Sequence, residues 1–184
     1  SAGLTNGGSA GNFQVQVSTD AENVLSTQTN NLTIAATASL TITQVTNSPN
    51  TVNGSAAYTI KFTTGSSGAL FPGDTIVVTF PANTLVPSSI AGSLITVNGT
   101  NLALSATGSG QRLAILSPVV VLTITNVTVS TSSSAGILNP TTVASNWTLT
   151  VSTAFAGGGG ESAATSPQYS TSATATTTTI SNVT

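Results

Sequence analysis

The nine residues AAYTIKFTT, Ala56 to Thr64, contain the pattern that decides the fold. Tyr58, Ile60 and Phe62 occupy every second position, and the charged Lys61 stands between two of them. Successive side chains of a β-strand point to opposite faces, so this alternation predicts a strand with one buried face. We expect the three large apolar side chains to point inward and Lys61 to point outward.

The same two-residue period recurs toward the C-terminus, and no helical period accompanies it. In DTIVVTF, residues 74–80, we expect Ile76, Val78 and Phe80 inward, with the strand ending at Pro81. SLITVNG and NLALSA form a predicted hairpin about Asn98-Gly99, a favoured turn dipeptide between apolar strands. Three further strands are predicted from RLAIL (112–116), VVVLTITNV (119–127) and NWTLTVSTAF (146–155).

Two of these strands carry further expectations. Val120, Leu122 and Ile124 share one face, whereas Val127 and Val129 fall on the other phase, which a β-bulge near Asn126 would explain. In the last strand the inward positions are Trp147, Leu149 and Val151. A GGGG break and a threonine-rich tail follow; the tail offers Tyr169, Ile180 and Val183 to a core, as an edge strand or partly solvated.

Many short strands with Gly, Pro and Asn turns indicate an all-β fold, an immunoglobulin-like two-sheet sandwich. Hydrophobic residues make up 39% of the chain and charged residues 3%, a composition unlike that of disordered proteins. Trp147 and the phenylalanines are expected between the two sheets.

The composition excludes several kinds of function. The chain has no His and no Cys, so a Ser or Thr nucleophile would lack its usual base, and we expect no catalytic, cofactor or metal site. Asp74 is expected to serve a turn, and Asp20 and Glu22 a solvated linker rather than a Ca²⁺ site. A net charge of −2 offers no surface for nucleic acid, and no apolar run has the length of a membrane span.

The N-terminal segment GNFQVQVST, Gly11 to Thr19, places Phe13, Val15 and Val17 on one face of an extended strand. It lies between the Gly/Ser-rich start of the chain and the polar stretch STDAENVLSTQTNN, residues 18–31. It is either the first strand of its own sandwich or a donor strand that completes a neighbouring copy. Donation, which we favour, links identical subunits through unlike surfaces and so builds an open filament.

We therefore divide the chain into a donor arm with linker, residues 1–30, and a sandwich domain, residues 31–184. The domain would begin with NLTIAATASLTITQV (31–45), which is long for one strand and is expected to bend near its alanines.

Six Asn residues stand in the N-x-Ser/Thr pattern of N-glycosylation acceptors: Asn31, Asn53, Asn98, Asn126, Asn146 and Asn182. A chain so rich in Ser and Thr contains several such sites by chance, so their number is weak evidence. Asn146 precedes an inward Trp147 and should point to solvent. At Asn53 and Asn98, ordinary Asn-Gly turn chemistry is the alternative explanation.

The scarcity of charge predicts an extracellular protein, because cytosolic proteins carry about a quarter charged residues. Few groups titrate and neither Cys nor Met is present, which suits a harsh, acidic habitat. The small-residue start SAG fits a mature chain whose signal peptide has been removed before Ser1, although a chain cut at this point would look the same.

Two stretches carry a resemblance: GALFPGDTIVVTFPANTLVPSSIAGSLITVNGT (68–100) and ILNPTTVASNWTLTVST (137–153). They resemble a β-sandwich module of prokaryotic surface-layer and appendage proteins, with Trp147 where that pattern often has Tyr. The whole chain resembles subunits of archaeal surface threads, or related donor-strand pili of thermoacidophilic archaea. The resemblance implies that residues 11–19 are the donor strand and that the six Asn positions carry glycans.

The resemblance also raises the isopeptide cross-links of surface pilins, for which Lys61 or the Ser1 amine would supply the nitrogen. An outward Lys61 departs from the usual buried arrangement. Our prediction is a structural subunit of a glycosylated extracellular filament that supports adhesion or biofilm formation, assembled from identical subunits. The alternatives are a carbohydrate-binding or adhesin module, or a surface-layer component.

Overall fold

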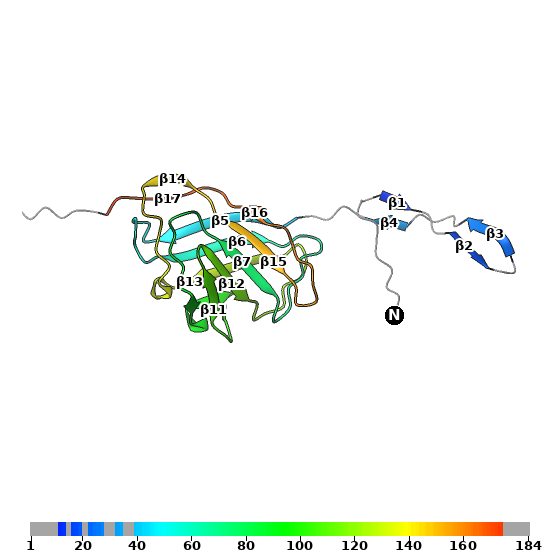
Figure 1. The fold of residues 1–184 in the computed structure, drawn as a ribbon, viewed down its shortest axis with the longest axis horizontal. Coiled ribbons are helices and arrows are strands. Elements are labelled where there is room, and N and C mark those ends of the chain that lie inside the picture. The colour runs from blue at the N-terminus through cyan, green and yellow to red at the C-terminus, as the bar shows by residue number, and fades with distance from the viewer. Residues whose placement is uncertain (1–10, 14–15, 20–21, 28–31, 35–38, 175–184) are drawn as a thin grey trace, which may run out of the picture. The chain divides into compact units, whose positions relative to one another are not determined.

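The computed structural model describes residues 11–13, 16–19, 22–27, 32–34 and 39–174. For the four short N-terminal segments it describes the backbone strands, and for residues 39–174 it also describes the side chains. The chain divides into two compact units, Ser1–Ala38 and Ser39–Thr184. The second unit is the sandwich, built from two antiparallel sheets (Figure 1). The all-β two-sheet prediction is confirmed.

The first sheet has five strands in the order β10-β9-β13-β6-β5. At its centre, β13 pairs with both β6 and β9, and the long strand β5 lies at one edge. β5 shows a register shift between Ile42 and Gln44, which moves the next buried position to Val45. The strands are β5 (Thr41–Ser48), β6 (Ala57–Thr63), β9 (Ile95–Val97), β10 (Thr100–Asn101) and β13 (Asn126–Thr131).

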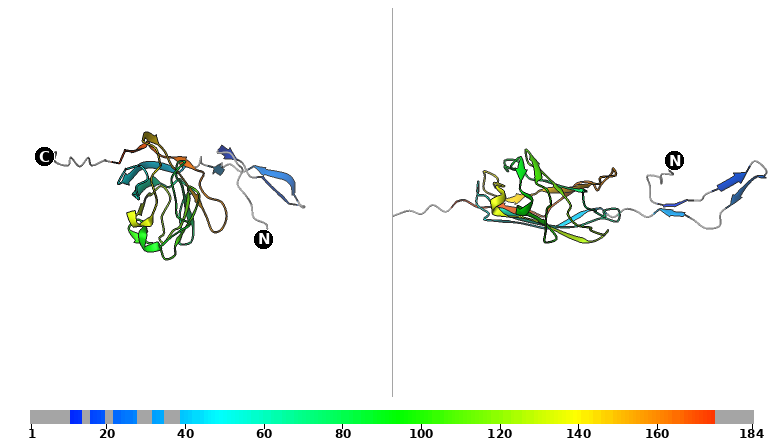
Figure 2. Two further views of the ribbon diagram at one scale, coloured as in Figure 1. Left: turned by 60° about the vertical axis from the view of Figure 1, so that its left-hand side comes forward. Right: turned by 90° about the horizontal axis from the view of Figure 1, so that it is seen from below.

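The second sheet has six strands in the order β16-β15-β7-β12-β11-β8, and β14 and β17 form a separate pair (Figure 2). Within residues 39–174 the remaining regular elements are two short 3-10 turns, η1 (Gly92–Leu94) and η2 (Ser133–Ala135). No helix in the described residues is long and apolar enough to cross a membrane. The strands are β7 (Thr75–Thr79), β8 (Ser89–Ile90), β11 (Ala106–Ser109), β12 (Arg112–Leu116), β14 (Ala144–Trp147), β15 (Thr150–Ala154), β16 (Ala164–Thr165) and β17 (Tyr169–Thr171).

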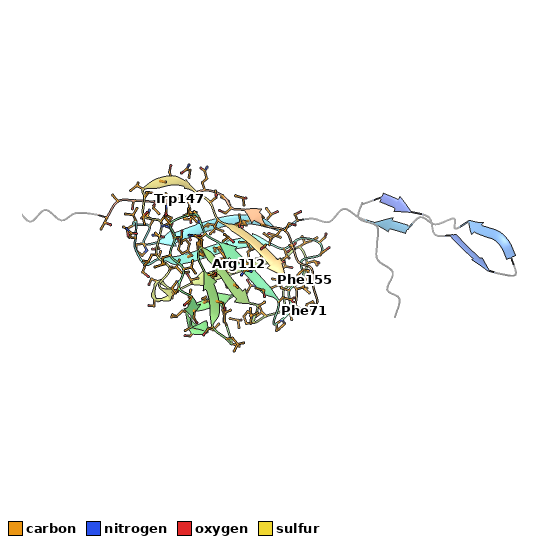
Figure 3. All side chains as sticks on the ribbon, in the orientation of Figure 1. Phe71, Arg112, Trp147 and Phe155 are labelled. Carbon is orange, nitrogen blue, oxygen red and sulfur yellow. The ribbon has the colours of Figure 1, made fainter. Side chains whose placement is uncertain are left out.

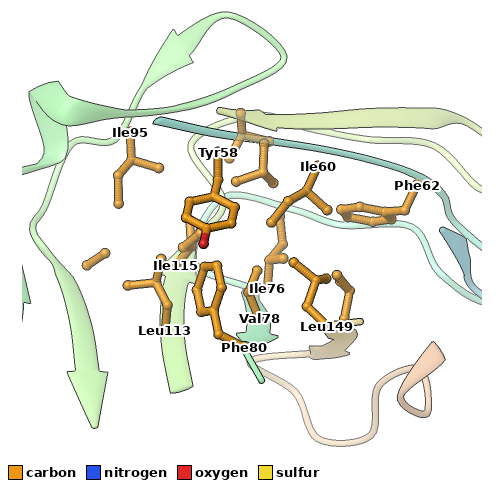
Figure 4. Packing of buried hydrophobic residues seen from close by; sticks show 14 of the residues in the cluster. Tyr58, Ile60, Phe62, Ile76, Val78, Phe80, Ile95, Leu113, Ile115 and Leu149 are labelled. Carbon is orange, nitrogen blue, oxygen red and sulfur yellow. The ribbon is translucent and has the colours of Figure 1, made fainter. Parts of the chain in front are cut away.

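The core lies between the two sheets and follows the predicted alternation (Figure 4). Tyr58, Ile60 and Phe62 of β6 are buried and Lys61 is exposed, as expected. From the facing sheet, Ile76 and Val78 of β7 are buried, with Phe80 directly after the strand. The rings of Tyr58 and Phe80 meet edge to face with centroids 4.9 Å apart, a favoured aromatic geometry. These central strand predictions are confirmed.

The predicted hairpin at Asn98-Gly99 is also confirmed. Val97 pairs with Thr100, which leaves the two residues between them as the turn. Asn98 has a φ of 51° and Gly99 a φ of 80°, and a two-residue hairpin of this kind requires positive φ at both positions. Asn and Gly tolerate that conformation better than other residues.

Val120, Leu122 and Ile124 were expected to share one face of a strand, but residues 119–125 form a connection with a turn, and all three side chains are exposed. The predicted bulge near Asn126 is wrong, because β13 starts at Asn126 and pairs with β6 in continuous register. Phe71 is also exposed, since its residue lies in a turn outside the sheets.

Trp147 is half-buried at the margin of the core, because it belongs to β14, which pairs with β17 outside the main sheets (Figure 3). Leu149 and Val151 beyond it are fully inside, as predicted. The C-terminal tail supplies two short strands: β16 at the edge of the six-stranded sheet, and β17, which carries the buried Tyr169. Ile180 and Val183 lie outside the described residues.

The N-terminal unit contains β1 (Gly11–Phe13), β2 (Gln16–Thr19), β3 (Glu22–Thr27) and β4 (Leu32–Ile34). β1 pairs with β4, and β2 pairs with β3. The stretch expected to be linker thus includes β3, and residues 31–45 are not one bent strand: β4 belongs to the first unit and β5 to the second. The boundary follows Ala38 rather than residue 30, because β4 finds its partner in β1.

Candidate functional site

The described N-terminal strands pair with one another, β1 with β4 and β2 with β3. Phe13 lies in β1 and Val17 in β2, while Val15 falls outside the described residues. As described, the two large sheets contain only strands from β5 onward, and the core cluster runs from Leu40 to Tyr169.

The sandwich carries an exposed apolar surface that sequence analysis did not predict. Phe71 is 55% exposed, Val120 56%, Leu122 68% and Ile124 66%. Leu70 and Val121 form an antiparallel bridge, with N···O distances of 2.8 Å in both directions. Phe71 follows Leu70 and Val120 precedes Val121, so these two residues flank the bridge. We call Phe71, Val120, Leu122 and Ile124 the apolar edge.

A hollow of about 220 Å³ opens close to the apolar edge. Leu104, which is 65% exposed, and Leu116, which is 40% exposed, contribute to its walls. Residues that line the hollow are close in the chain to residues of the apolar edge: Pro72 follows Phe71, and Pro118 lies two residues before Val120. The lining residues are Pro72, Gly73, Ala103, Leu104, Leu116, Ser117 and Pro118, and none of them is charged.

Four of the six N-glycosylation patterns lie in the described residues, and all four Asn side chains are exposed: Asn53, Asn98, Asn126 and Asn146. Asn53 sits in a turn with a φ of 53°. The Oδ1 atom of Asn98 accepts a hydrogen bond from the Thr128 N–H at 2.8 Å, and that of Asn126 from the Thr63 hydroxyl at 2.8 Å. These bonds leave the amide nitrogens, the atoms that carry an N-linked glycan, at the surface. Asn31 and Asn182 lie outside the described residues.

Lys61 lies on the outer face of the five-stranded sheet, at the middle of β6. Its cross-strand neighbours are Gln44 of β5 and Thr128 of β13. An intramolecular isopeptide bond joins a Lys to an Asn or Asp with an acid nearby. Neither Gln44 nor Thr128 is an Asn or an acidic residue. The exposed position agrees with the sequence pattern and leaves Lys61 without the buried setting of such bonds.

The two acidic residues of the sandwich hold loops together. Asp74 is buried, and its carboxylate accepts hydrogen bonds from the N–H groups of Phe71 and Ala156, each at 2.8 Å. The turn role predicted for Asp74 is confirmed. Phe71 and Phe155 accordingly lie at the same end of the sandwich (Figure 3). Of the other two acids, Asp20 is outside the described residues and Glu22 begins β3.

Glu161 spans from the loop after β15 to the turn at residues 65–68. Its Oε1 accepts the Gly65 N–H at 2.6 Å, while the buried Oε2 has no hydrogen-bond partner. A Cβ at Gly68 would meet this carboxylate, the mobile end of the Glu161 side chain. Burial raises the pKa of Glu161 above its usual value, and the hydrogen bond from Gly65 offsets part of that shift. No group of three potential metal ligands occurs among the described residues.

Asn139, which is followed by Pro140 and lies outside the six N-x-Ser/Thr patterns, is the centre of a buried polar network. Its side chain is fully buried and makes four hydrogen bonds. Oδ1 accepts from the Tyr58 hydroxyl at 2.6 Å and from the Asn47 amide at 3.1 Å. Nδ2 donates to the carbonyls of Pro49 and Thr51, both at 2.8 Å. Burial raises the pKa of Tyr58 to about 12. The network joins the end of β5 to the segment before β14.

Comparisons with known proteins add one distant likeness. No protein family and no curated protein matches the chain. Among solved structures, the crystal structure of BcpA, the major pilin subunit of Bacillus cereus, is similar with a TM-score of 0.44 and 10% sequence identity. The match covers 88% of this chain and 48% of that one, so the chain spans about half the length of the pilin.

Proposed function

We propose that this protein is a structural subunit of an extracellular filament that polymerises by donor-strand complementation. In this proposal the segment Gly11–Thr19 of one subunit adds as a strand to the sandwich of the next. The observation that carries it is the division of the chain into two compact units: among the described strands, β1 pairs with β4 and β2 pairs with β3, while the sandwich unit begins at Ser39.

The energetics of such a contact favour a stable polymer. Burying Phe13, Val15 and Val17 would contribute roughly 5–8 kcal/mol by apolar transfer. Main-chain hydrogen bonds along the added strand would contribute as well, against the entropy of ordering the segment. Donor and acceptor are different surfaces, so the contact is heterologous and extends into an open filament of identical subunits.

The surface chemistry suits an extracellular setting. The exposed Asn53, Asn98, Asn126 and Asn146 are available for N-linked glycans, and we include glycosylation in the proposal, with Asn31 and Asn182 as further sites. Adhesion or biofilm formation would be the cellular use of the filament. The alternative of a carbohydrate-binding module gains no support from Trp147, because its ring packs on the core margin and its Nε1–H donates to the Thr171 hydroxyl at 2.9 Å.

The test compares two triple variants of the full chain. One replaces Phe13, Val15 and Val17 by Ser; its matched control replaces the interleaved Asn12, Gln14 and Gln16 by Ser. Refolded wild type and control should form filaments, seen by electron microscopy and light scattering, whereas the first variant should remain monomeric. Equal polymerisation of both variants would refute the proposal. The intact mass of protein from its native source, compared with the 18.0 kDa of the sequence, tests the glycans.

A further inference from the structure

The connection between β12 and β13 presents an unpaired strand edge. The N–H and C=O groups of Val121 both bond to Leu70. Neighbouring residues of an extended chain point their backbone groups to opposite sides, so those of Val120 point away from Leu70. Within residues 39–174 the N–H groups of Val120 and Leu122 form no hydrogen bond, although the Leu122 carbonyl accepts one from the Thr64 hydroxyl at 2.9 Å. Backbone groups of this kind need a partner or water.

Around Val121 the side chains alternate between solvent and the core, and the turn at residues 123–124 follows. Val120, Leu122 and Ile124 are each more than half exposed, while Val121 between them is buried. Ile124 has a φ of 53°, a conformation that is strained for a β-branched residue. Strained backbone and exposed apolar side chains both oppose stability, and they persist together where a surface has a binding role.

The adjoining hollow indicates the size of what this surface receives. At about 220 Å³ it is smaller than the ~300–1,000 Å³ of small-molecule sites. Its apolar walls suit one large side chain of a protein partner, which is how anchor residues dock at interfaces.

We propose that the apolar edge and the hollow together form the site that receives the N-terminal strand Gly11–Thr19 of a second copy of this chain. This inference rests on the proposed function for its occupant. The donor segment is uncharged, as are the residues of the edge and the hollow. Its apolar residues repeat every second position, the spacing of Val120, Leu122 and Ile124. Phe13, the one aromatic residue before Tyr58, is the anchor for the hollow, and the donor backbone pairs with the free N–H groups of Val120 and Leu122.

Lysine substitutions in the full chain test the site. Val120→Lys and Leu122→Lys place a charge on the edge, a change that blocks strand addition. Val143→Lys is the matched control, since Val143 is 60% exposed and lies outside the surface. All three variants should unfold at the denaturant concentration of wild type. The critical concentration for polymerisation should rise about tenfold or more for the two edge variants and stay near wild type for the control.

Hydrogen exchange supplies a second measurement. The amides of Val120 and Leu122 should exchange rapidly in dilute monomer and slowly in filaments, whereas the amide of Val121 should be slow in both states. Protection of Val120 in dilute monomer would overturn the inference, because the strand would then dock within its own molecule.

The two proposals fail in different ways. If the Phe13, Val15 and Val17 triple variant blocks assembly but both edge variants polymerise like wild type, the donor strand stands and this acceptor site is overturned. If the edge variants weaken assembly and the triple variant does not, the surface contacts another part of the second copy, which overturns the assigned occupant. If neither change affects assembly, both proposals fall.

Discussion

Asn139 offers the sharpest test of what holds the sandwich together, through the isosteric change Asn139→Asp. The wild-type amide uses two N–H donors on the carbonyls of Pro49 and Thr51. A carboxylate would place a charged oxygen against both carbonyls inside the protein, which is strongly unfavourable. The folded variant therefore keeps this carboxyl protonated, as a neutral acid with one donor where the amide had two.

The magnitude follows from that protonation. An Asp in the unfolded chain has a pKa of about 3.9, so holding it neutral at pH 7 costs about 4 kcal/mol, at about 1.4 kcal/mol per pH unit. The lost hydrogen bond adds about 1 kcal/mol, for a total of about 5 kcal/mol at pH 7. Because the folded pKa is raised above the unfolded one, the deficit shrinks to about 1 kcal/mol below pH 4 and grows as the pH rises.

Urea unfolding of wild type and variant between pH 3 and pH 7 measures this difference. Asn146→Asp, at an exposed position, is the control and should change stability by less than about 0.5 kcal/mol at every pH. A deficit below about 1 kcal/mol at pH 7 for Asn139→Asp, or one that does not vary with pH, would refute the role assigned to this network.

Two further predictions concern the acidic residues of the sandwich. Asp74→Ala should lower the free energy of unfolding by about 2–5 kcal/mol, because the N–H groups of Phe71 and Ala156 would lose their hydrogen bonds to the carboxylate. In urea unfolding, Asp74→Asn should have a stability between that of Asp74→Ala and wild type. Equal stability of all three proteins would contradict this. Burial raises the pKa of Glu161 in the folded protein above its value in the unfolded chain. Glu161 therefore adds to the free energy of unfolding below the unfolded pKa, and this stabilisation is lost as the pH rises through the folded pKa. Wild type should therefore gain stability as the pH falls from 7 to 4, while Glu161→Gln should lack this gain; parallel pH profiles of the two proteins would show the assignment to be wrong.

The central strands and their turns could be predicted from local sequence patterns. In the strands from Tyr58 to Phe62 and from Ile76 to Phe80, the large apolar side chains share one face, so only one orientation of each strand buries them all. The Asn98-Gly99 hairpin was equally local, because its positive φ angles suit few residue pairs. These features depend on neighbours within a few residues, which the chain order contains in full. The turn positions of Asn53 and Asn98 and the outward direction of Asn146 followed from the same local patterns.

Which side of an alternating pattern meets the core depends on contacts across the whole fold. Alternation shows that Val120, Leu122 and Ile124 share a face, but whether that face is buried depends on Leu70 pairing with Val121 across the fold. The partners of Asn139 and Glu161 lie many tens of residues away in the chain, so no local pattern marks them. β4 likewise pairs with β1 instead of extending β5. Local sequence patterns are compatible with several strand arrangements, and long-range pairing selects one of them, because burial is a property of the whole packed fold.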